Sequence, residues 1–125
     1  MNENALSGKI IGAAIEVHRV LGPGLLESAY ELALAHELGI CGIRVERQKP
    51  VALRYKEIVL GDGFRLDLLV DGCLVVEIKA VESLLPIHEA QLLTYLRLSG
   101  HRLGLLINFN VPILKNGIKR VVNEL

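Results

Sequence analysis

Apolar residues recur at helical spacing in three stretches of the chain. Between residues 7 and 21 they share one face of a helix, while Lys9, Glu16 and Arg19 lie on the opposite face. A glycine or a proline marks at least one end of each stretch. The pattern predicts helices over residues 7–21, 25–38 and 86–99.

Shorter stretches rich in Val, Ile and Leu predict strands between and after these helices. The sequences Gly61-Asp62-Gly63 and Asp71-Gly72 are typical of turns. The predicted strands cover residues 43–47, 50–55, 64–70, 73–80 and 102–109, and residues 118–122 form a last strand or a short helix. The order α-α-β-β-β-α-β indicates a single α/β domain over residues 1–125, with a mixed sheet flanked by helices.

The hairpin predicted over residues 64–80 concentrates charge on one face. Asp67 in its first strand and Glu77 and Lys79 in its second strand lie on that face if the apolar faces of the two strands coincide. The predicted apolar face of the first strand consists of Phe64, Leu66, Leu68 and Val70.

The register of this hairpin decides whether the charged side chains meet. A two-residue loop at Asp71-Gly72 places Asp67 in the apolar layer without a partner, which is unfavourable. We therefore predict a three-residue loop, Val70-Asp71-Gly72, which pairs Leu69 with Cys73, or another loop of the same parity.

Two different arrangements are compatible with the group formed by Asp67, Glu77 and Lys79. Neighbouring carboxylates repel each other unless a cation lies between them, and hard oxygen ligands favour Mg²⁺ or Mn²⁺. Lys79 could then hold a water molecule or stabilise a developing oxyanion. The alternative is a salt-bridge cluster on a solvated sheet face, because this spacing also occurs by chance.

Composition limits the partners of the protein. The 125 residues include 14 basic and 14 acidic side chains, so contact with nucleic acid must be local rather than a general basic coat. No apolar stretch is long enough to span a membrane, and the first residues do not resemble a secretory signal. Cys41 and Cys73 suffice for neither a disulfide framework nor a zinc site. We expect a cytoplasmic protein.

Several motifs resemble those of known nucleases. Asp67 followed by Glu77-Ile78-Lys79 resembles the core of the PD-(D/E)XK nuclease superfamily, with Leu66 at the position of the proline. Residues 24–30, GLLESAY, resemble the G-x-x-E-x-x-Y signature of the GxxExxY branch. Residues 91–95, QLLTY, resemble the Q-x-x-x-Y motif of RecB-like nucleases. The resemblance covers nearly the whole chain and implies a restriction-endonuclease-like fold.

The resemblance also implies a metal-dependent nuclease. Asp67 and Glu77 would bind Mg²⁺ or Mn²⁺, with the carbonyl group of Ile78 as a further ligand. Lys79 would position the attacking water or stabilise the charge of the transition state. The implied substrate is nucleic acid, with DNA favoured over RNA. The alternative is a non-catalytic interaction module on a nuclease-like scaffold.

Two helices would add residues to this site. By resemblance, Glu27 would be an additional acid that binds the metal directly or through water, although a helix N-terminus by itself also favours a negative charge. Gln91 would orient Lys79, the water or a phosphate group. Tyr95 lies on the same predicted polar stripe as Gln91 and His88, and we expect this stripe to be buried against the site.

The remaining candidates have alternative interpretations. We expect Tyr30 to pack in the core and to form a hydrogen bond with Glu27. His18 is either a core histidine satisfied by a carbonyl group or part of the catalytic pocket. Gln48 matches a family position without an assigned role. Three basic residues near the C-terminus could bind phosphate or form a solvated end: Lys115, Lys119 and Arg120. A homodimer or a protein partner could enlarge the binding surface.

Overall fold

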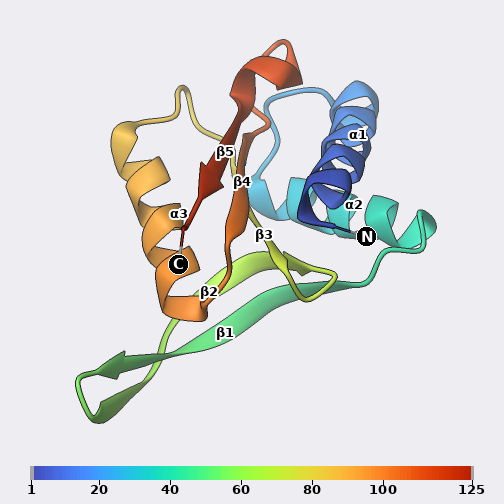
Figure 1. The fold of residues 1–125 in the computed structure, drawn as a ribbon. Helices are drawn as coiled ribbons and strands as arrows, with labels where there is room; N and C mark the ends of the chain where they lie inside the picture. Colours follow the sequence, from blue (N-terminus) through green and yellow to red (C-terminus); the bar gives the residue numbers. More distant parts are fainter. Residues whose placement is uncertain (1, 125) are drawn as a thin grey trace.

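The computed structural model describes residues 2–124. The sheet contains five strands, and three helices flank it (Figure 1). The helices are α1 (Glu3–Leu21), α2 (Glu27–Ile40) and α3 (Pro86–Ser99), and a short 3₁₀ helix, η1, covers Leu114–Gly117. The strands are β1 (Val45–Tyr55), β2 (Ile58–Val70), β3 (Leu74–Lys79), β4 (Leu103–Asn108) and β5 (Ile118–Val122). The predicted fold class is confirmed.

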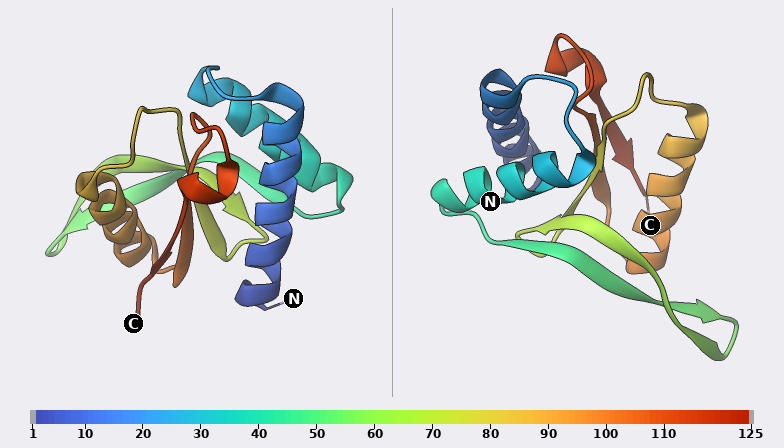
Figure 2. Two further views of the ribbon diagram at one scale, coloured as in Figure 1. Left: turned by 90° about the horizontal axis from the view of Figure 1, so that it is seen from above. Right: turned by 180° about the vertical axis from the view of Figure 1, so that it is seen from behind.

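The strands follow the order β1-β2-β3-β4-β5 across the sheet. Only β3 and β4 are parallel, because α3 connects them, whereas the other neighbouring strands are antiparallel. Helices α1 and α2 cover one face of the sheet and α3 covers the other (Figure 2). The sheet is therefore the middle layer of three, and its central strands β3 and β4 are buried on both faces.

The prediction of a turn at Gly61-Asp62-Gly63 is wrong, because these residues lie inside β2. The chain reverses instead at Lys56-Glu57, where Lys56 has a φ of 55° and Tyr55 pairs with Ile58. Gly63 is needed for close packing, since a Cβ atom there would lie 2.5 Å from the Cβ atom of Leu53. The strands β1 and β2 consequently form one long hairpin that projects from the body (Figure 1).

The hairpin between β2 and β3 has the predicted parity but not the predicted register. Leu69 pairs with Val75 rather than with Cys73, and Val70 pairs with Leu74. Asp71 and Gly72 both have positive φ values, of 52° and 68°. The loop therefore consists of Asp71-Gly72-Cys73, and the partner of each β2 residue lies two residues further along β3 than predicted.

The predicted apolar face of β2 does not stay on one side of the sheet. Phe64 and Leu66 pack with α3, whereas Leu68 and Val70 pack with α1 and α2. The regular alternation of side chains is therefore interrupted at Asp67, the residue between these two pairs. The interruption places Asp67 at the boundary between the two cores.

No helix within residues 2–124 is both long enough and apolar enough to cross a membrane. Both cysteines are free thiols, and Cys41 is exposed while Cys73 is partly buried.

Candidate active site

Asp67 and Glu77 hold each other in place where β2 and β3 separate. The ladder between the two strands ends at the pair Leu68 and Val76, one step before Asp67 and Glu77. Beyond that pair, the amide of Asp67 donates a hydrogen bond to Glu77 Oε1 at 3.2 Å. The amide of Ile78 donates one to Asp67 Oδ2 at 2.9 Å. The side chains thus replace main-chain bonds of the ladder and bring the two carboxylates together.

The environment of Glu77 makes its negative charge unfavourable. Its side chain is only 5% exposed, and burial together with the carboxylate of Asp67 raises the pKa of Glu77 to about 8. The ammonium group of Lys79 acts in the opposite direction and lowers the pKa of Glu77, although its effect is smaller. At neutral pH, the two carboxylates therefore need either a proton or a cation between them.

Lys79 is the last residue of β3, and its main chain is held by β4 and the residue that follows it. It pairs with Asn108 of β4, and the amide of Phe109 donates a hydrogen bond to the carbonyl group of Lys79 at 2.9 Å. Asn108 is 1% exposed, and it accepts from the amide of Val81 at 3.0 Å and donates to the carbonyl group of Val81 at 2.9 Å. The chain that leaves β3 is therefore fixed around Lys79.

Glu27 lies near Asp67, at the exposed start of α2. It lines a pocket of about 370 Å³ together with Asp67 and Ile78. Within residues 2–124, no three side chains of His, Cys, Asp or Glu come together as a metal-binding group. The role of Glu27 as an additional metal ligand thus remains a prediction. The first turn of α2 has no side-chain cap, so a negative charge there also complements the helix dipole.

The predicted hydrogen bond between Tyr30 and Glu27 is wrong. Tyr30 is fully buried and stacks on Phe109 with ring centroids 4.5 Å apart, as expected for a core residue. Its hydroxyl group donates to the carbonyl oxygen of Gly22 at 2.6 Å and accepts from the amide of Leu25 at 3.1 Å. Tyr30 therefore holds the loop that leads into α2 and, through this loop, sets where Glu27 begins the helix.

The predicted polar stripe on α3 divides into three different environments. Tyr95 stacks on Phe64 with ring centroids 4.3 Å apart, and burial and the charges of Glu77 and Asp67 raise its pKa. Tyr95 therefore lies within the electrostatic influence of the acidic pair. His88 accepts a hydrogen bond from the amide of Leu85 at 3.0 Å and caps the start of α3. Gln91 is exposed, so the prediction of a continuous buried stripe is wrong.

His18 is a satisfied core histidine, as one of its two interpretations predicts. Its Nε2 atom lies 2.8 Å from the carbonyl oxygen of Val111, and its ring is 6.4 Å from that of Phe109. His18 is not among the residues that line the pocket of Asp67.

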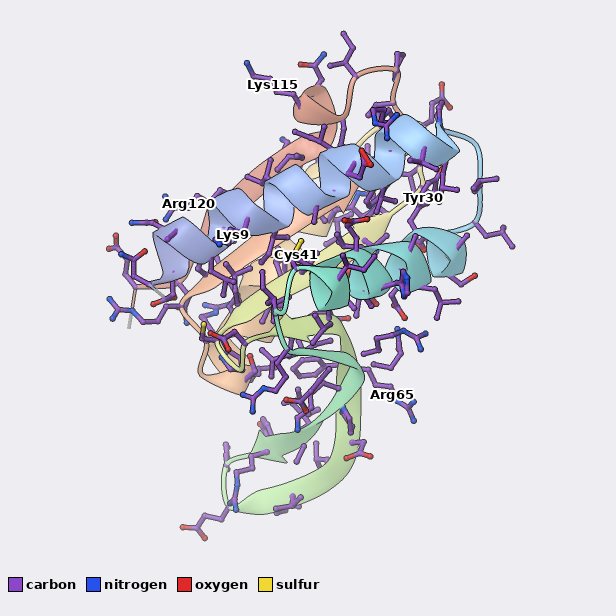
Figure 3. All side chains as sticks on the ribbon, turned by 90° about the vertical axis from the view of Figure 1, so that its right-hand side faces the viewer. Lys9, Tyr30, Cys41, Arg65, Lys115 and Arg120 are labelled. Atoms are coloured by element: carbon purple, nitrogen blue, oxygen red, sulfur yellow. The ribbon has the colours of Figure 1, made fainter. Side chains whose placement is uncertain are left out.

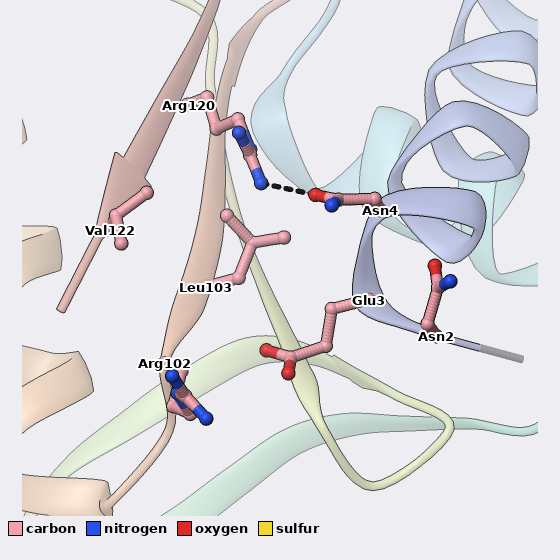
Figure 4. Close-up of a pocket in the computed structure, with 7 residues that line it drawn as sticks. All are labelled: Asn2, Glu3, Asn4, Arg102, Leu103, Arg120 and Val122. Atoms are coloured by element: carbon pink, nitrogen blue, oxygen red, sulfur yellow. Dashed lines mark hydrogen bonds between the residues drawn. The ribbon is translucent and has the colours of Figure 1, made fainter. Parts of the chain in front are cut away.

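The three basic residues near the C-terminus do not form one group. Lys119 forms an ion pair with Glu89 at 2.8 Å. Arg120 donates to the side chain of Asn4 in a separate pocket at the start of α1, which also includes Arg102 (Figure 4). In Figure 3, Lys115 of η1 and Arg120 of β5 lie near different parts of α1. The phosphate site suggested for these three residues as a group is therefore not supported.

The sequence interpretation missed a buried cluster next to Asp67. Glu31 of α2 is 6% exposed and accepts hydrogen bonds from Arg47 Nη2 at 2.9 Å and from Gln48 Nε2 at 2.6 Å. The same Gln48 Nε2 lies 3.5 Å from Asp67 Oδ1. A signal was present, because Glu31 follows Glu27 by one helical turn and faces the same way.

The fold and the site define a three-layer α/β protein with an acidic pair and a lysine on adjacent central strands. The family model described as the PD-(D/E)XK nuclease superfamily matches residues 4–121, and the chain belongs to this superfamily. Membership in it suggests nuclease activity. No curated protein and no solved structure matches the chain.

Proposed function

We propose that the protein hydrolyses phosphodiester bonds in nucleic acid, with DNA as its substrate, in a reaction that depends on Mg²⁺ or Mn²⁺. The observation that carries this proposal is the pair of hydrogen bonds from the amide of Asp67 to Glu77 and from the amide of Ile78 to Asp67, with Lys79 two residues after Glu77 on β3. In a member of the PD-(D/E)XK superfamily, these three residues are the natural candidates for the active site.

The acidic pair suits a divalent cation. Asp67 and Glu77 each use one oxygen for a main-chain amide. Among residues 2–124, the other oxygens, Asp67 Oδ1 and Glu77 Oε2, have no hydrogen bond shorter than the 3.5 Å contact from Gln48. Carboxylate oxygens are the ligands that Mg²⁺ and Mn²⁺ prefer. A cation would offset both the burial of the negative charge and the repulsion from Asp67, which together raise the pKa of Glu77. Charge that builds up on the phosphate during hydrolysis is what a bound cation neutralises.

Lys79 would hold the attacking water or stabilise the negative charge that develops on the phosphate. Its fixed main chain supports such a role, because a catalytic group acts best when its position is set beforehand. Glu27 would contribute a further acid from the mouth of the pocket. Tyr95 would contact the site from α3. Gln91, which is exposed, would reach the lysine, the water or the phosphate only once substrate is bound.

The protein carries no net charge, so its affinity for nucleic acid must come from local contacts around this site. The motifs at residues 24–30 and 91–95 support placing the chain in the GxxExxY and RecB-like branch of the superfamily. We further propose that residues 1–125 act as one domain in the cytoplasm. Specificity would then depend on substrate structure, on a second copy of the chain or on a protein partner.

Cleavage of a substrate panel tests this function. The purified protein would be incubated at low salt with Mg²⁺ or Mn²⁺ and with supercoiled plasmid, linear duplex, single-stranded DNA, branched DNA and RNA. Lys79→Ala removes the proposed catalytic lysine. The matched control is Lys9→Ala, which removes an exposed lysine from α1.

Cleavage of one substrate by the wild type and by Lys9→Ala, with a loss of at least about 100-fold in Lys79→Ala, is the expected result. Equal cleavage by all three proteins would show that Lys79 is not part of the site. If no substrate is cleaved and Mg²⁺ does not bind, the chain is better described as a non-catalytic interaction module.

A further inference from the structure

Arg47 of β1 is held by a buried carboxylate and still has unused hydrogen-bond donors. Its Nε and Nη2 atoms donate to Glu31 Oε2 at 3.2 and 2.9 Å. A guanidinium group has five N–H donors, so both donors of Nη1 and one of Nη2 are not used by this ion pair. The side chain of Arg47 is 42% exposed, whereas that of Glu31 is 8% exposed. The edge of the guanidinium formed by Nε and Nη2 is therefore fixed by Glu31, and the remaining N–H groups can reach a ligand.

The backbone of β1 is distorted at Gln48, the residue after Arg47. Neighbouring residues of a strand normally point to opposite faces, yet Arg47 and Gln48 both donate to the carboxylate of Glu31. Gln48 makes this possible because its φ is 51°, although Arg47 and Lys49 on either side keep a continuous register with β2. The left-handed conformation is unfavourable for a residue other than glycine. The strain is located directly beside Asp67, as is common at functional sites.

Arg47 lines the same pocket as Asp67, one member of the acidic pair. The pocket of about 370 Å³ is lined by Glu27, Ser28, Glu31, Arg47, Gln48, Asp67 and Ile78. Every ionisable side chain in this set except Arg47 is a carboxylate. A negatively charged substrate that approaches Asp67 therefore needs a cationic contact, and Arg47 is the one cationic side chain that lines this pocket.

We propose that Arg47 binds a phosphate group of the nucleic acid substrate, and that Glu31 and Gln48 position its guanidinium for this contact. The inference rests on the proposed nuclease function and adds a substrate-binding residue to it. Arginine suits this task because its planar donors match two phosphate oxygens at once. Glu31 and Gln48 act through Arg47 and do not themselves contact the substrate.

A charge-neutral double variant tests the proposal. Glu31→Gln/Arg47→Gln removes one charge of each sign, so the net charge is unchanged and no buried carboxylate loses its partner. The matched control is Glu16→Gln/Arg19→Gln, because Arg19 and Glu16 form a similar pair at 2.7 Å on the exposed face of α1. Binding of a labelled duplex and a labelled single strand would be measured by fluorescence anisotropy in EDTA at several salt concentrations. Circular dichroism would confirm that both variants are folded.

The dissociation constant of the Glu31→Gln/Arg47→Gln variant should rise about tenfold, and the control should stay within about twofold of the wild type. The logarithm of the association constant falls linearly with the logarithm of the salt concentration. The steepness of this line should decrease by about 0.9 for the duplex or about 0.7 for the single strand, as the loss of one phosphate contact requires. A folded variant that binds like the wild type, with the same slope, overturns the role of Arg47 while leaving the nuclease proposal intact. A wild-type protein that neither binds nor cleaves nucleic acid overturns both.

Discussion

Asp67 and Glu77 are each bonded to the main chain around the other residue. The amide of Asp67 donates to the side chain of Glu77, and the amide that follows Glu77, that of Ile78, donates to the side chain of Asp67. Neither carboxylate can turn away without leaving an amide unpaired, which costs about 1–3 kcal/mol. The separation of β2 from β3 thus creates the acidic pair and also fixes its geometry.

This pair should make the stability of the metal-free protein depend on pH. The pKa of Glu77 is about 8 in the folded state and close to its usual 4.5 in the unfolded state. Between these two values, the unfolded chain has released a proton that the folded chain still holds. The contribution of Glu77 to the free energy of unfolding should therefore be largest below pH 4.5, decrease as the pH rises and level off above about pH 8.

Urea denaturation in EDTA across this pH range measures the effect. Each pKa unit of difference corresponds to about 1.4 kcal/mol. Glu77→Gln should remove most of the decrease, because an amide does not titrate, whereas Glu57→Gln at the exposed tip of the β1–β2 hairpin should keep it. The same decrease in Glu77→Gln as in the wild type would show that another group is responsible.

Asn108 should support activity without contacting the substrate. Its side chain makes two hydrogen bonds with the main chain of Val81, two residues after Lys79. Asn108→Ala leaves these partly buried groups unpaired and should lower the free energy of unfolding by about 2 kcal/mol. We expect kcat for the best substrate to decrease while KM changes little, because Lys79 loses its fixed position.

The control for this variant is Asn116→Ala, since the side chain of Asn116 is exposed in η1. It should match the wild type in both stability and kcat. If Asn108→Ala destabilises the protein but cleaves at the wild-type rate, Asn108 is purely structural.

Tyr30 allows a test of the loop that leads into α2. Tyr30→Phe keeps the stacking on Phe109 but removes the hydroxyl group that bonds Gly22 and Leu25. The free energy of unfolding should decrease by about 1–2 kcal/mol. Tyr55→Phe should have no such effect, because Tyr55 is 59% exposed. An unchanged stability in Tyr30→Phe would contradict the importance of these two bonds.

Much of the fold and the acidic pair could be predicted from the sequence. The periodicity of apolar residues marks the three helices, and the rule that a carboxylate avoids an apolar layer selects the correct parity at Asp67. These predictions succeed because they depend on local spacing and on the cost of burying charge.

Other features depend on contacts between distant segments. The glycines at 61 and 63 suggest a turn, but Gly63 is required by its packing against Leu53 on the neighbouring strand. The cluster of Glu31, Arg47 and Gln48 depends on a left-handed backbone at a glutamine, which residue type does not indicate. Gln91 lies at helical spacing from Tyr95, yet only the packing of α3 on the sheet decides which of them is buried.

The most direct test of the active site is the rate at which the Asp67→Asn variant cleaves the preferred substrate in Mg²⁺. The substitution keeps the size of the side chain and an oxygen that can accept from Ile78, but it removes the negative charge. Asp62→Asn is the control, since Asp62 is an exposed residue of the same strand. We predict that Asp67→Asn loses at least about 100-fold in rate and that Asp62→Asn cleaves like the wild type. A folded Asp67→Asn variant that cleaves at the wild-type rate would contradict the assignment of the active site.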